Sequence, residues 1–393
     1  MEEEIMSINQ EHSQHFTLDG FTQSIHQPSP IDSKLSSVLE LSDKIKERMK
    51  EPITFLPALI HHNSEPAIFP NSIAIIQGQS GVHKSGIAQS ICACLIKSDS
   101  IQHSLLGFEL SPTARDIGVL YIDTERNLSD QLPYAMQKIV IQAGYSITDI
   151  PANFNCISFL KTPRKERLEL ANTLLNYYTK KHKNHLLVVL DVSTDFLSDF
   201  NNVSDSMNLS DMMNQMINEH NVTFICVIHE NPGSEKARGH YGTEISNKAT
   251  TIMQVSECKH NVRPEPTYEL KFLKNRNTRR LASMFFEFNV ESRNLVQLDK
   301  EIVNAIIDSK KHKANVEQVQ QVMELLFASV DEISRQDLLQ KMSVNLNIGE
   351  RTAIDRLKEF LHSAITITKE GIPHTLSVEK KNKHDIYFLT IKQ

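Results

Sequence analysis

The sequence contains few cysteines, and their spacing argues against two common uses. The five are odd in number and form no C-x-x-C pair: Cys92, Cys94, Cys156, Cys226 and Cys258. This pattern indicates neither a disulfide framework nor a zinc site. Because most of the five lie in apolar stretches, we expect buried thiols.

A long apolar run is also absent. No stretch approaches the roughly 20 apolar residues that cross a bilayer. The first residues, MEEEIMSINQEHSQ, are acidic and polar, unlike a signal peptide. We therefore expect a cytoplasmic protein with no membrane partner. Its 393 residues, 40% hydrophobic and 23% charged, predict a globular chain of two or three units.

The chain carries no excess of positive charge. Its 42 lysines and arginines face 48 aspartates and glutamates, which gives a formal net charge of −6. This balance argues against a protein that coats nucleic acid through its overall charge. It does not exclude local basic patches that bind nucleic acid.

One motif stands out at residues 78–85, which read GQSGVHKS between the apolar run SIAIIQ and the helical pattern GIAQSICACLI. A strand, a glycine-bearing loop and a helix N-terminus supply backbone N–H groups to phosphates, with a lysine and a magnesium-binding hydroxyl. The sequence therefore predicts a nucleoside triphosphate site. Its expected contacts are Gly78, Gln79, Ser80, Gly81, Val82, His83, Lys84, Ser85 and Gly86.

The loop departs from the pattern G-x-x-x-x-G-K-[ST] at one position. His83 stands where glycine is usual, and we expect its Cβ to crowd the phosphate path. The alternative to a phosphate loop is an ordinary strand-to-helix turn inside a buried α/β unit.

Apolar runs and helical patterns alternate beyond this motif. Runs at residues 118–123, 156–160, 186–191 and 223–229 are separated by helical patterns near 132–143, 165–182 and 207–220. Continuous apolar strands with intervening helices predict an α/β fold, a mostly parallel twisted sheet flanked by helices. Three later runs, at 249–255, 267–275 and 283–290, alternate like antiparallel strands at the edge of the sheet.

Two carboxylates follow predicted strands. Asp191 closes the run LLVVLD, where it reaches the water shell of a magnesium ion held by Ser85 or caps a helix. No glutamate follows Asp191. Glu125, at the end of VLYIDTE, is the candidate base if its strand lies beside the phosphate-loop strand. Otherwise it is a solvent-facing loop acid.

The order of these motifs resembles RecA-like P-loop ATPases. GQSGVHKS, YIDTE, LVVLD and CVIHEN follow in the family's order, joined by ARGHYGTEISNKA and KNRNT. The chain looks most like the RepA/DnaB helicase type of bacterial plasmids and mobile elements, over about residues 51–298. The resemblance implies ATP and Mg²⁺ as cofactors and a ring-shaped homo-oligomer, for which a hexamer is one candidate size.

The resemblance also assigns roles. Lys84 and Ser85 match the phosphate-loop lysine and hydroxyl, Glu125 the catalytic base, Asp191 the magnesium aspartate and His229 the γ-phosphate sensor. A lone histidine at a strand end is equally a structural residue.

A basic pair near the end of the core has two interpretations. Lys274 and Arg276 match the K-x-R pair that related ring helicases insert into a neighbouring subunit's nucleotide site. The other interpretation is a basic β-turn, since two more arginines follow.

Two regions are candidates for DNA binding. Residues 230–242, ENPGSEKARGHYG, are expected to form a flexible loop that carries Lys236, Arg238 and His240. In a ring, such a loop faces single-stranded DNA in the central channel. The alternative is a mobile surface loop with scattered charges. After a linker at residues 308–313, or a solvated helix end there, three helical patterns and a hairpin follow the winged-helix order, an α+β module. Its candidate DNA contacts are Arg351, Arg356 and Lys381; winged helices also dock proteins.

The sequence thus predicts three parts: a flexible arm with a short helix at residues 1–50, a RecA-like ATPase domain at 51–300 and a winged-helix-like domain at 308–393. The leading hypothesis is Mg-dependent ATP hydrolysis coupled to DNA binding or remodelling, as helicase or loader, alongside other mobile-element proteins. The alternatives are a nucleotide-switched DNA-binding adaptor with little hydrolysis, and a small-molecule phosphotransferase.

Overall fold

The computed structural model describes residues 30–101, 104–260, 262–276, 278–311 and 314–392. The chain divides into two compact units, Met1–Leu56 and Pro57–Gln393. The first unit holds α1, Pro30–Met49, which is longer than the short helix expected from the sequence. Proline suits the first helical position, where no N–H is needed. The expected flexible arm lies outside the described residues.

The second unit is built on a nine-stranded sheet with the order β12-β11-β10-β9-β3-β8-β7-β5-β6. Its strands are β3 (Ile73–Gly78), β5 (Ile117–Asp123), β6 (Phe154–Ser158), β7 (His185–Asp191), β8 (Val222–His229), β9 (Thr251–Glu257), β10 (Tyr268–Asn275), β11 (Met284–Asn289) and β12 (Asn294–Gln297).

Six of these strands, from β9 to β6, run parallel, and β10, β11 and β12 continue antiparallel. The expectation that the run at 249–255 is antiparallel was wrong with respect to β3, because β9 pairs with β3 in parallel. Antiparallel pairing begins only between β9 and β10.

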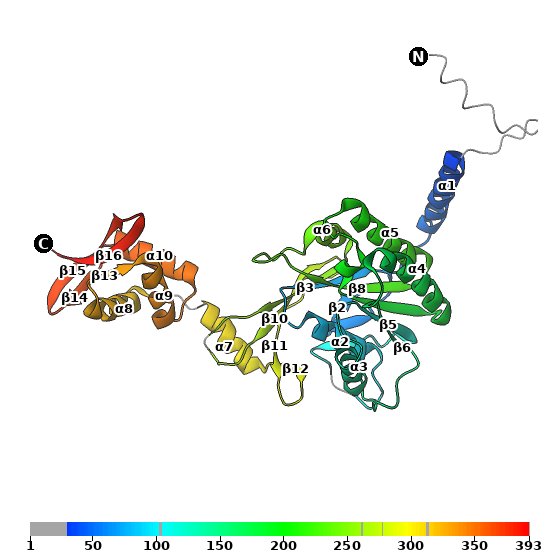
Figure 1. The fold of residues 1–393 in the computed structure, drawn as a ribbon, viewed down its shortest axis with the longest axis horizontal. Coiled ribbons are helices and arrows are strands. Elements are labelled where there is room, and N and C mark those ends of the chain that lie inside the picture. Colours follow the sequence, from blue (N-terminus) through cyan, green and yellow to red (C-terminus); the bar gives the residue numbers. More distant parts are fainter. Residues whose placement is uncertain (1–29, 102–103, 261, 277, 312–313, 393) are drawn as a thin grey trace, which may run out of the picture. The chain divides into compact units, whose positions relative to one another are not determined.

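Helices cover both faces of the sheet (Figure 1). The helices are α2 (Lys84–Leu95) and α3 (Gln131–Gln142) on one face, and α4 (Arg164–Lys181), α5 (Val203–Glu219) and α6 (Gly239–Lys248) on the other; a short 3₁₀ turn, Ser193–Phe196, follows β7. Ala74 and Ile76 of β3 pack with the first group, and Ile73 and Ile75 with the second, as the two-residue period of a strand requires.

Burial on both faces explains the continuous apolar runs, since all seven residues of β7 are buried. The parallel-dominated sheet with flanking helices confirms the α/β class and fits the RecA-like fold that the resemblance implies.

A small second sheet, with the order β2-β1-β4, was not expected from the sequence. Its strands are β1 (Ile60–His62), β2 (Glu65–Ile68) and β4 (Phe108–Leu110). Ile60, Ile68 and Phe108 are fully buried and join the core beneath α2 and α3. Strands of three or four residues are too short to show a period in the sequence.

The chain continues through α7, Lys300–Lys311, whose Ile306 packs with Cys258, Phe285 and Leu298. The expected linker at 308–313 is therefore helical at least through Lys311, as in the solvated-helix alternative; residues 312–313 lie outside the described residues.

The last part has its own core and a four-stranded antiparallel sheet of order β13-β16-β15-β14. Its elements are α8 (Val316–Ser329), β13 (Glu332–Ser334), α9 (Arg335–Leu346), α10 (Glu350–His362), β14 (Thr366–Lys369), β15 (Ile372–Lys381) and β16 (His384–Ile391). The three helices and the hairpin lie where the sequence predicts them, while β13 and β14 were missed. The winged-helix assignment stays a prediction.

Four of the five cysteines are buried, and Cys156 is exposed, which corrects the expectation for that residue. Burial raises the pKa of both Cys94 and Cys226 to about 12, so these thiols stay protonated. Among the described residues, no helix has the length and apolar character that a membrane span needs.

Candidate nucleotide site

The candidate residues gather where the parallel strands end. The phosphate loop follows β3, His229 ends β8, Asp191 ends β7 and Glu125 follows β5. The carboxyl ends of parallel strands form the usual ligand crevice of an open α/β sheet. Glu125 was expected on a strand beside β3, and this was wrong, because β8 and β7 lie between β3 and β5.

The loop backbone leaves little room at its first glycine. A Cβ on Gly78 would lie 2.3 Å from the carbonyl oxygen of Val255 and 2.9 Å from Cγ2 of Val82. Gly81 has a φ of 81°, which favours glycine, and its missing Cβ faces open space. These two positions therefore require the glycines of the motif.

Lys84 is held inside this loop. It is the first residue of α2, only 5% exposed, and its Nζ donates to the carbonyl oxygen of Gln79 at 2.7 Å. Burial lowers the pKa of Lys84, while Asp191 and Glu125 act in the opposite direction. An ammonium placed at a helix N-terminus in this way is suited to an anionic ligand.

His83 has a left-handed backbone with φ 67°, the conformation that explains why glycine is usual here. Its ring stacks on Phe288 at a centroid distance of 5.3 Å and meets Tyr268 edge-on at 4.7 Å. The side chain is thus packed against β10 and β11, where it lines a cavity of about 350 Å³. Whether its Cβ crowds the phosphates stays a prediction.

Ser85 and Asp191 are in direct contact, and their role as metal ligands stays a prediction. Ser85 Oγ donates to Asp191 Oδ1 at 3.0 Å, and the Tyr121 hydroxyl donates to Oδ2 at 2.5 Å. Burial raises the pKa of Tyr121, so this phenol keeps its proton. A hydroxyl and one carboxylate fit Mg²⁺, which takes few protein oxygens and leaves its other positions to phosphate and water. No cluster of three or more His, Cys, Asp or Glu side chains suited to a metal occurs among the described residues.

Lys84, His229 and Glu125 form a continuous row. His229 Nδ1 lies 3.2 Å from Lys84 Nζ, and its Nε2 lies 3.8 Å from Glu125 Oε1. Interaction with His229 is the main reason that the pKa of Glu125 is lowered, against an opposing effect of burial. Glu125 is therefore an ionised carboxylate at the edge of the site.

Arg126 was not singled out from the sequence. Its Nη1 donates to Asp191 Oδ2 at 2.9 Å and also to Asp123 Oδ2, while its backbone N–H donates to Asp123 Oδ1 at 2.8 Å. Burial alone would lower the pKa of Arg126, yet Asp191 and Asp123 raise it. The only sequence signal is its place directly after Glu125.

Gln79 connects the phosphate loop to the segment after β8. Its Nε2 donates to the carbonyl oxygens of Asn231 at 2.9 Å and Ser234 at 3.0 Å. Beneath it, the buried Glu230 carboxylate accepts hydrogen bonds from Gln77 and Gln254. The two loops are therefore fastened together at the sheet edge.

The expected loop at 230–242 is shorter than predicted, because α6 begins at Gly239 and includes His240. Lys236, Arg238 and His240 are all exposed. The guanidinium of Arg238 stacks over Phe200 at 4.7 Å. Lys236 and Arg238 lie in the connection before α6 and His240 in its first turn, and their contact with DNA stays a prediction.

Lys274 and Arg276 lie near the amino ends of the parallel strands, opposite the end where the candidate nucleotide site lies. Lys274 Nζ donates to the carbonyl oxygen of Ser246 at 2.7 Å, and both side chains donate to that of Asn247. Both cations thus contact the C-terminal end of α6, where a helix favours positive charge. Burial, followed by Arg276, lowers the pKa of Lys274.

Of the three cations named in the C-terminal part, two are paired there. Arg356 bonds Glu359, and Lys381 contacts Glu332 at 2.5 Å and Glu379 at 2.9 Å. Arg351, at the start of α10, is exposed.

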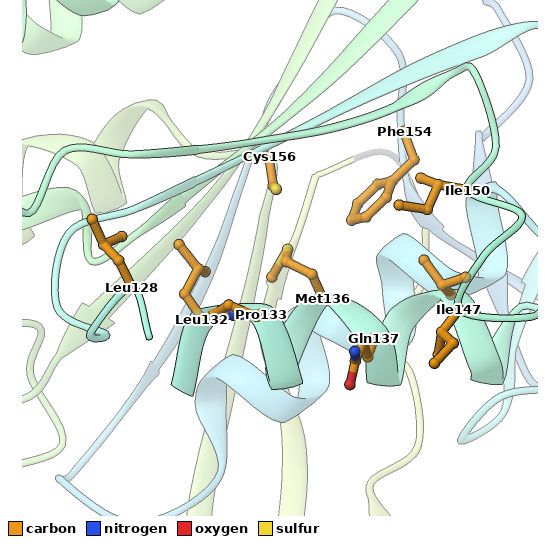
Figure 2. A pocket seen from close by; sticks show the side chains of 10 residues that line it. Leu128, Leu132, Pro133, Met136, Gln137, Ile147, Ile150, Phe154 and Cys156 are labelled. Carbon is orange, nitrogen blue, oxygen red and sulfur yellow. The ribbon is translucent and has the colours of Figure 1, made fainter. Parts of the chain in front are cut away.

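A second cavity, of about 370 Å³, lies along α3 and β6 (Figure 2). Its walls are mostly apolar, with Leu132, Met136 and Phe154 pointing into it, and Cys156 is its only nucleophile. It holds none of the residues predicted to bind nucleotide.

Comparison with known proteins gives little. No family model and no curated protein matches the chain. Among solved structures, the flagellar accessory protein FlaH from Methanocaldococcus jannaschii is similar with a TM-score of 0.40 and 15% identity, covering 58% of this chain and 90% of FlaH. The RadB recombinase gives 0.40 and 13%, covering 58% and 92%. Likeness at this level says nothing about what the chain does.

Proposed function

We propose that the chain hydrolyses ATP with Mg²⁺ and couples hydrolysis to binding or remodelling of DNA, as a helicase or loader of a mobile element. The observation that carries the proposal is the row Lys84, His229 and Glu125 across three strand ends, beside the Ser85 and Asp191 pair. A phosphate-binding lysine, a sensor position and an ionised carboxylate are the parts that phosphoryl transfer to water requires.

Each side chain has a definite task in this scheme. Lys84 binds the terminal phosphates, and Ser85 and Asp191 hold the metal, which neutralises phosphate charge when bound. Glu125 orients a water molecule and accepts its proton. His229 touches both Lys84 and Glu125, so it senses whether the terminal phosphate is present.

Coupling to DNA runs through Gln79. The phosphate loop supplies the Gln79 side chain, which holds the carbonyl oxygens of Asn231 and Ser234, and the exposed Lys236 and Arg238 follow in the same connection. A shift of the phosphate loop with nucleotide therefore moves a basic segment suited to a nucleic-acid backbone. The mobile-element context is supported only by the motif order.

We also propose that the chain assembles into a ring, and the position of the basic pair supports this. Asn275 pairs with Thr251, and Thr251 with Ala74, so Lys274 and Arg276 lie near the start of β3. The phosphate loop begins four residues later, about 13 Å along the strand. An arginine there does not reach its own site, and we propose that Arg276 completes the site of a neighbouring subunit.

One observation favours a second function, a nucleotide-switched adaptor with little hydrolysis. His83 has a left-handed conformation, and its ring contacts both Tyr268 and Phe288, so a packed side chain occupies the position where the phosphate-loop pattern has glycine. Such a loop suits slow turnover and assembly on binding.

The test is steady-state ATP hydrolysis with and without single-stranded DNA. We expect turnover that DNA stimulates and that Lys84→Ala abolishes. Lys183→Ala is the matched control: it removes an exposed lysine in the connection between α4 and β7, and we expect it to leave turnover unchanged. Nucleotide binding without turnover would favour the adaptor, and no binding of Mg-ATP at millimolar concentration would end both proposals.

A further inference from the structure

Two buried carboxylates lie side by side at the edge of the site. Asp123 and Asp191 are register partners at the ends of the parallel strands β5 and β7. Asp123 is 0% and Asp191 2% exposed. A carboxylate buried in this way is costly to ionise without a partner. Two adjacent carboxylates of this kind require a cation.

Arg126 is that cation. A single nitrogen, Nη1, donates to both Asp123 Oδ2 and Asp191 Oδ2, and only 21% of the Arg126 side chain is exposed. The backbone N–H groups of Glu125 and Arg126 complete the coordination of Asp123 Oδ1. The tight turn after β5 thus places this arginine over both acids.

The two oxygens of Asp191 have separate partners. Oδ1 faces Ser85, on the side where the proposed function places metal, and Oδ2 faces Tyr121 and Arg126. A positive charge is therefore already bonded to this carboxylate before any metal arrives. Like charges repel, so the guanidinium weakens the binding of a free divalent ion.

We infer that Arg126 is an internal counter-cation that keeps free divalent metal away from the Asp123 and Asp191 pair, so that metal enters only together with nucleotide phosphates. The phosphates bring the additional negative charge and oxygen ligands that overcome the repulsion from Arg126. Without the arginine, two carboxylates and the Tyr121 oxygen offer a divalent ion an oxygen-rich pocket.

Lysine is a poor replacement at this position. Both carboxylates are bonded by Nη1 at the end of the long arginine side chain, and a guanidinium is more weakly hydrated than an ammonium, so it is better suited to a buried ion pair. Arg126→Lys is therefore expected to exclude metal less well than the native chain.

The experiment measures Mn²⁺ binding to the full-length, nucleotide-free protein by electron paramagnetic resonance. Arg126→Gln is expected to bind Mn²⁺ at least tenfold more tightly than the native chain. Arg115→Gln, which removes an exposed arginine, is the matched control and keeps native affinity. Adding Asp123→Asn to Arg126→Gln is expected to abolish the gain, because the second carboxylate is then neutral.

Equal Mn²⁺ affinity of the native and Arg126→Gln proteins overturns the inference. If Arg126→Gln does not fold, Arg126→Lys replaces it, and native affinity of that variant has the same meaning. Because the relevance to ATP rests on the proposed function, nucleotide is left out of this test. If Arg126→Gln binds Mn²⁺ more tightly but the native chain binds no ATP, only the proposed function is refuted. If the native chain hydrolyses ATP but Arg126→Gln binds Mn²⁺ with native affinity, only the inference is refuted.

Discussion

The Nζ of Lys84 lies 3.2 Å from Nδ1 of His229, which links the phosphate loop directly to the end of β8. An ammonium carries only donors, so Nδ1 accepts from Lys84 and the ring N–H that can donate is on Nε2. That nitrogen faces Glu125 at 3.8 Å. The ring therefore orients a donor toward the proposed base.

We expect Glu125→Gln to lower ATP turnover by about 10²- to 10⁴-fold, the range for loss of a general base. Binding of Mg-ATP should remain, because Lys84, Ser85 and Asp191 are intact. Steady-state turnover and calorimetric binding measure the two effects separately. Glu291→Gln, at an exposed position, is the control. Undiminished turnover in Glu125→Gln would show that another group activates water.

His229→Ala should behave differently from Glu125→Gln. It removes the contact that lowers the pKa of Glu125, so the pKa of this carboxyl is expected to rise toward its ordinary value. The acidic limb of the pH–rate profile should then move to higher pH. An acidic limb that does not move would mean that His229 does not act on Glu125.

Gln79→Ala should uncouple DNA from hydrolysis. The substitution removes the two hydrogen bonds to Asn231 and Ser234 but leaves the Gln79 carbonyl that accepts from Lys84. We expect loss of most of the stimulation by DNA, measured as the ratio of turnover with and without DNA, because two neutral hydrogen bonds worth about 1 kcal/mol each no longer join the two loops. Full stimulation in this variant would place the coupling elsewhere.

The buried strands could be predicted from the sequence, but their neighbours could not. The runs that became β3, β7 and β8 are apolar on both faces and end at glycine or polar residues, a clear signal. Periodicity carries no information on strand order, so Glu125 was assigned to a strand adjacent to β3. The direction of β9 was missed for the same reason.

Some residues of the candidate site could also be predicted from the sequence, and others could not. Lys84, Ser85 and Asp191 follow from a motif and an apolar strand end, and Ser85 and Asp191 are in direct contact. Gln79 and Arg126 act through side-chain contacts with distant segments, 152 residues away for Gln79 and Asn231. No local pattern encodes such contacts, and tertiary packing alone creates them.

Acid should destabilise the fold through two buried histidines. Burial lowers the pKa of His62 and of His185 to about 4 in the folded state, below the ordinary 6.5. The unfolded chain then binds more protons between these values, so the free energy of unfolding falls as pH drops from 6.5 toward 4. At pH 5 the loss is about 2 kcal/mol for each histidine.

His185→Gln isolates one of these contributions, because an amide does not titrate and the Gln side chain extends to about the position of the ring Nε2, which contacts the Thr223 hydroxyl at 3.0 Å. Urea unfolding at pH 7.5 and pH 5 should show a pH dependence smaller by about 2 kcal/mol than in the native chain. An unchanged pH dependence would mean that His185 is protonated in the fold.

Mixing two inactive variants tests whether Arg276 acts between subunits. Arg276→Ala keeps the proposed base, and Glu125→Gln keeps the proposed finger, so a site between them is complete only when each comes from a different chain. Random mixing in equal amounts makes about one site in four native-like, and turnover should recover to about a quarter of the native rate. Arg279→Ala, a neighbouring exposed arginine paired with Glu65, should retain native turnover alone. If the mixture stays as inactive as its components while both variants assemble with native mass, the contacts of Arg276 with the end of α6 are its whole role.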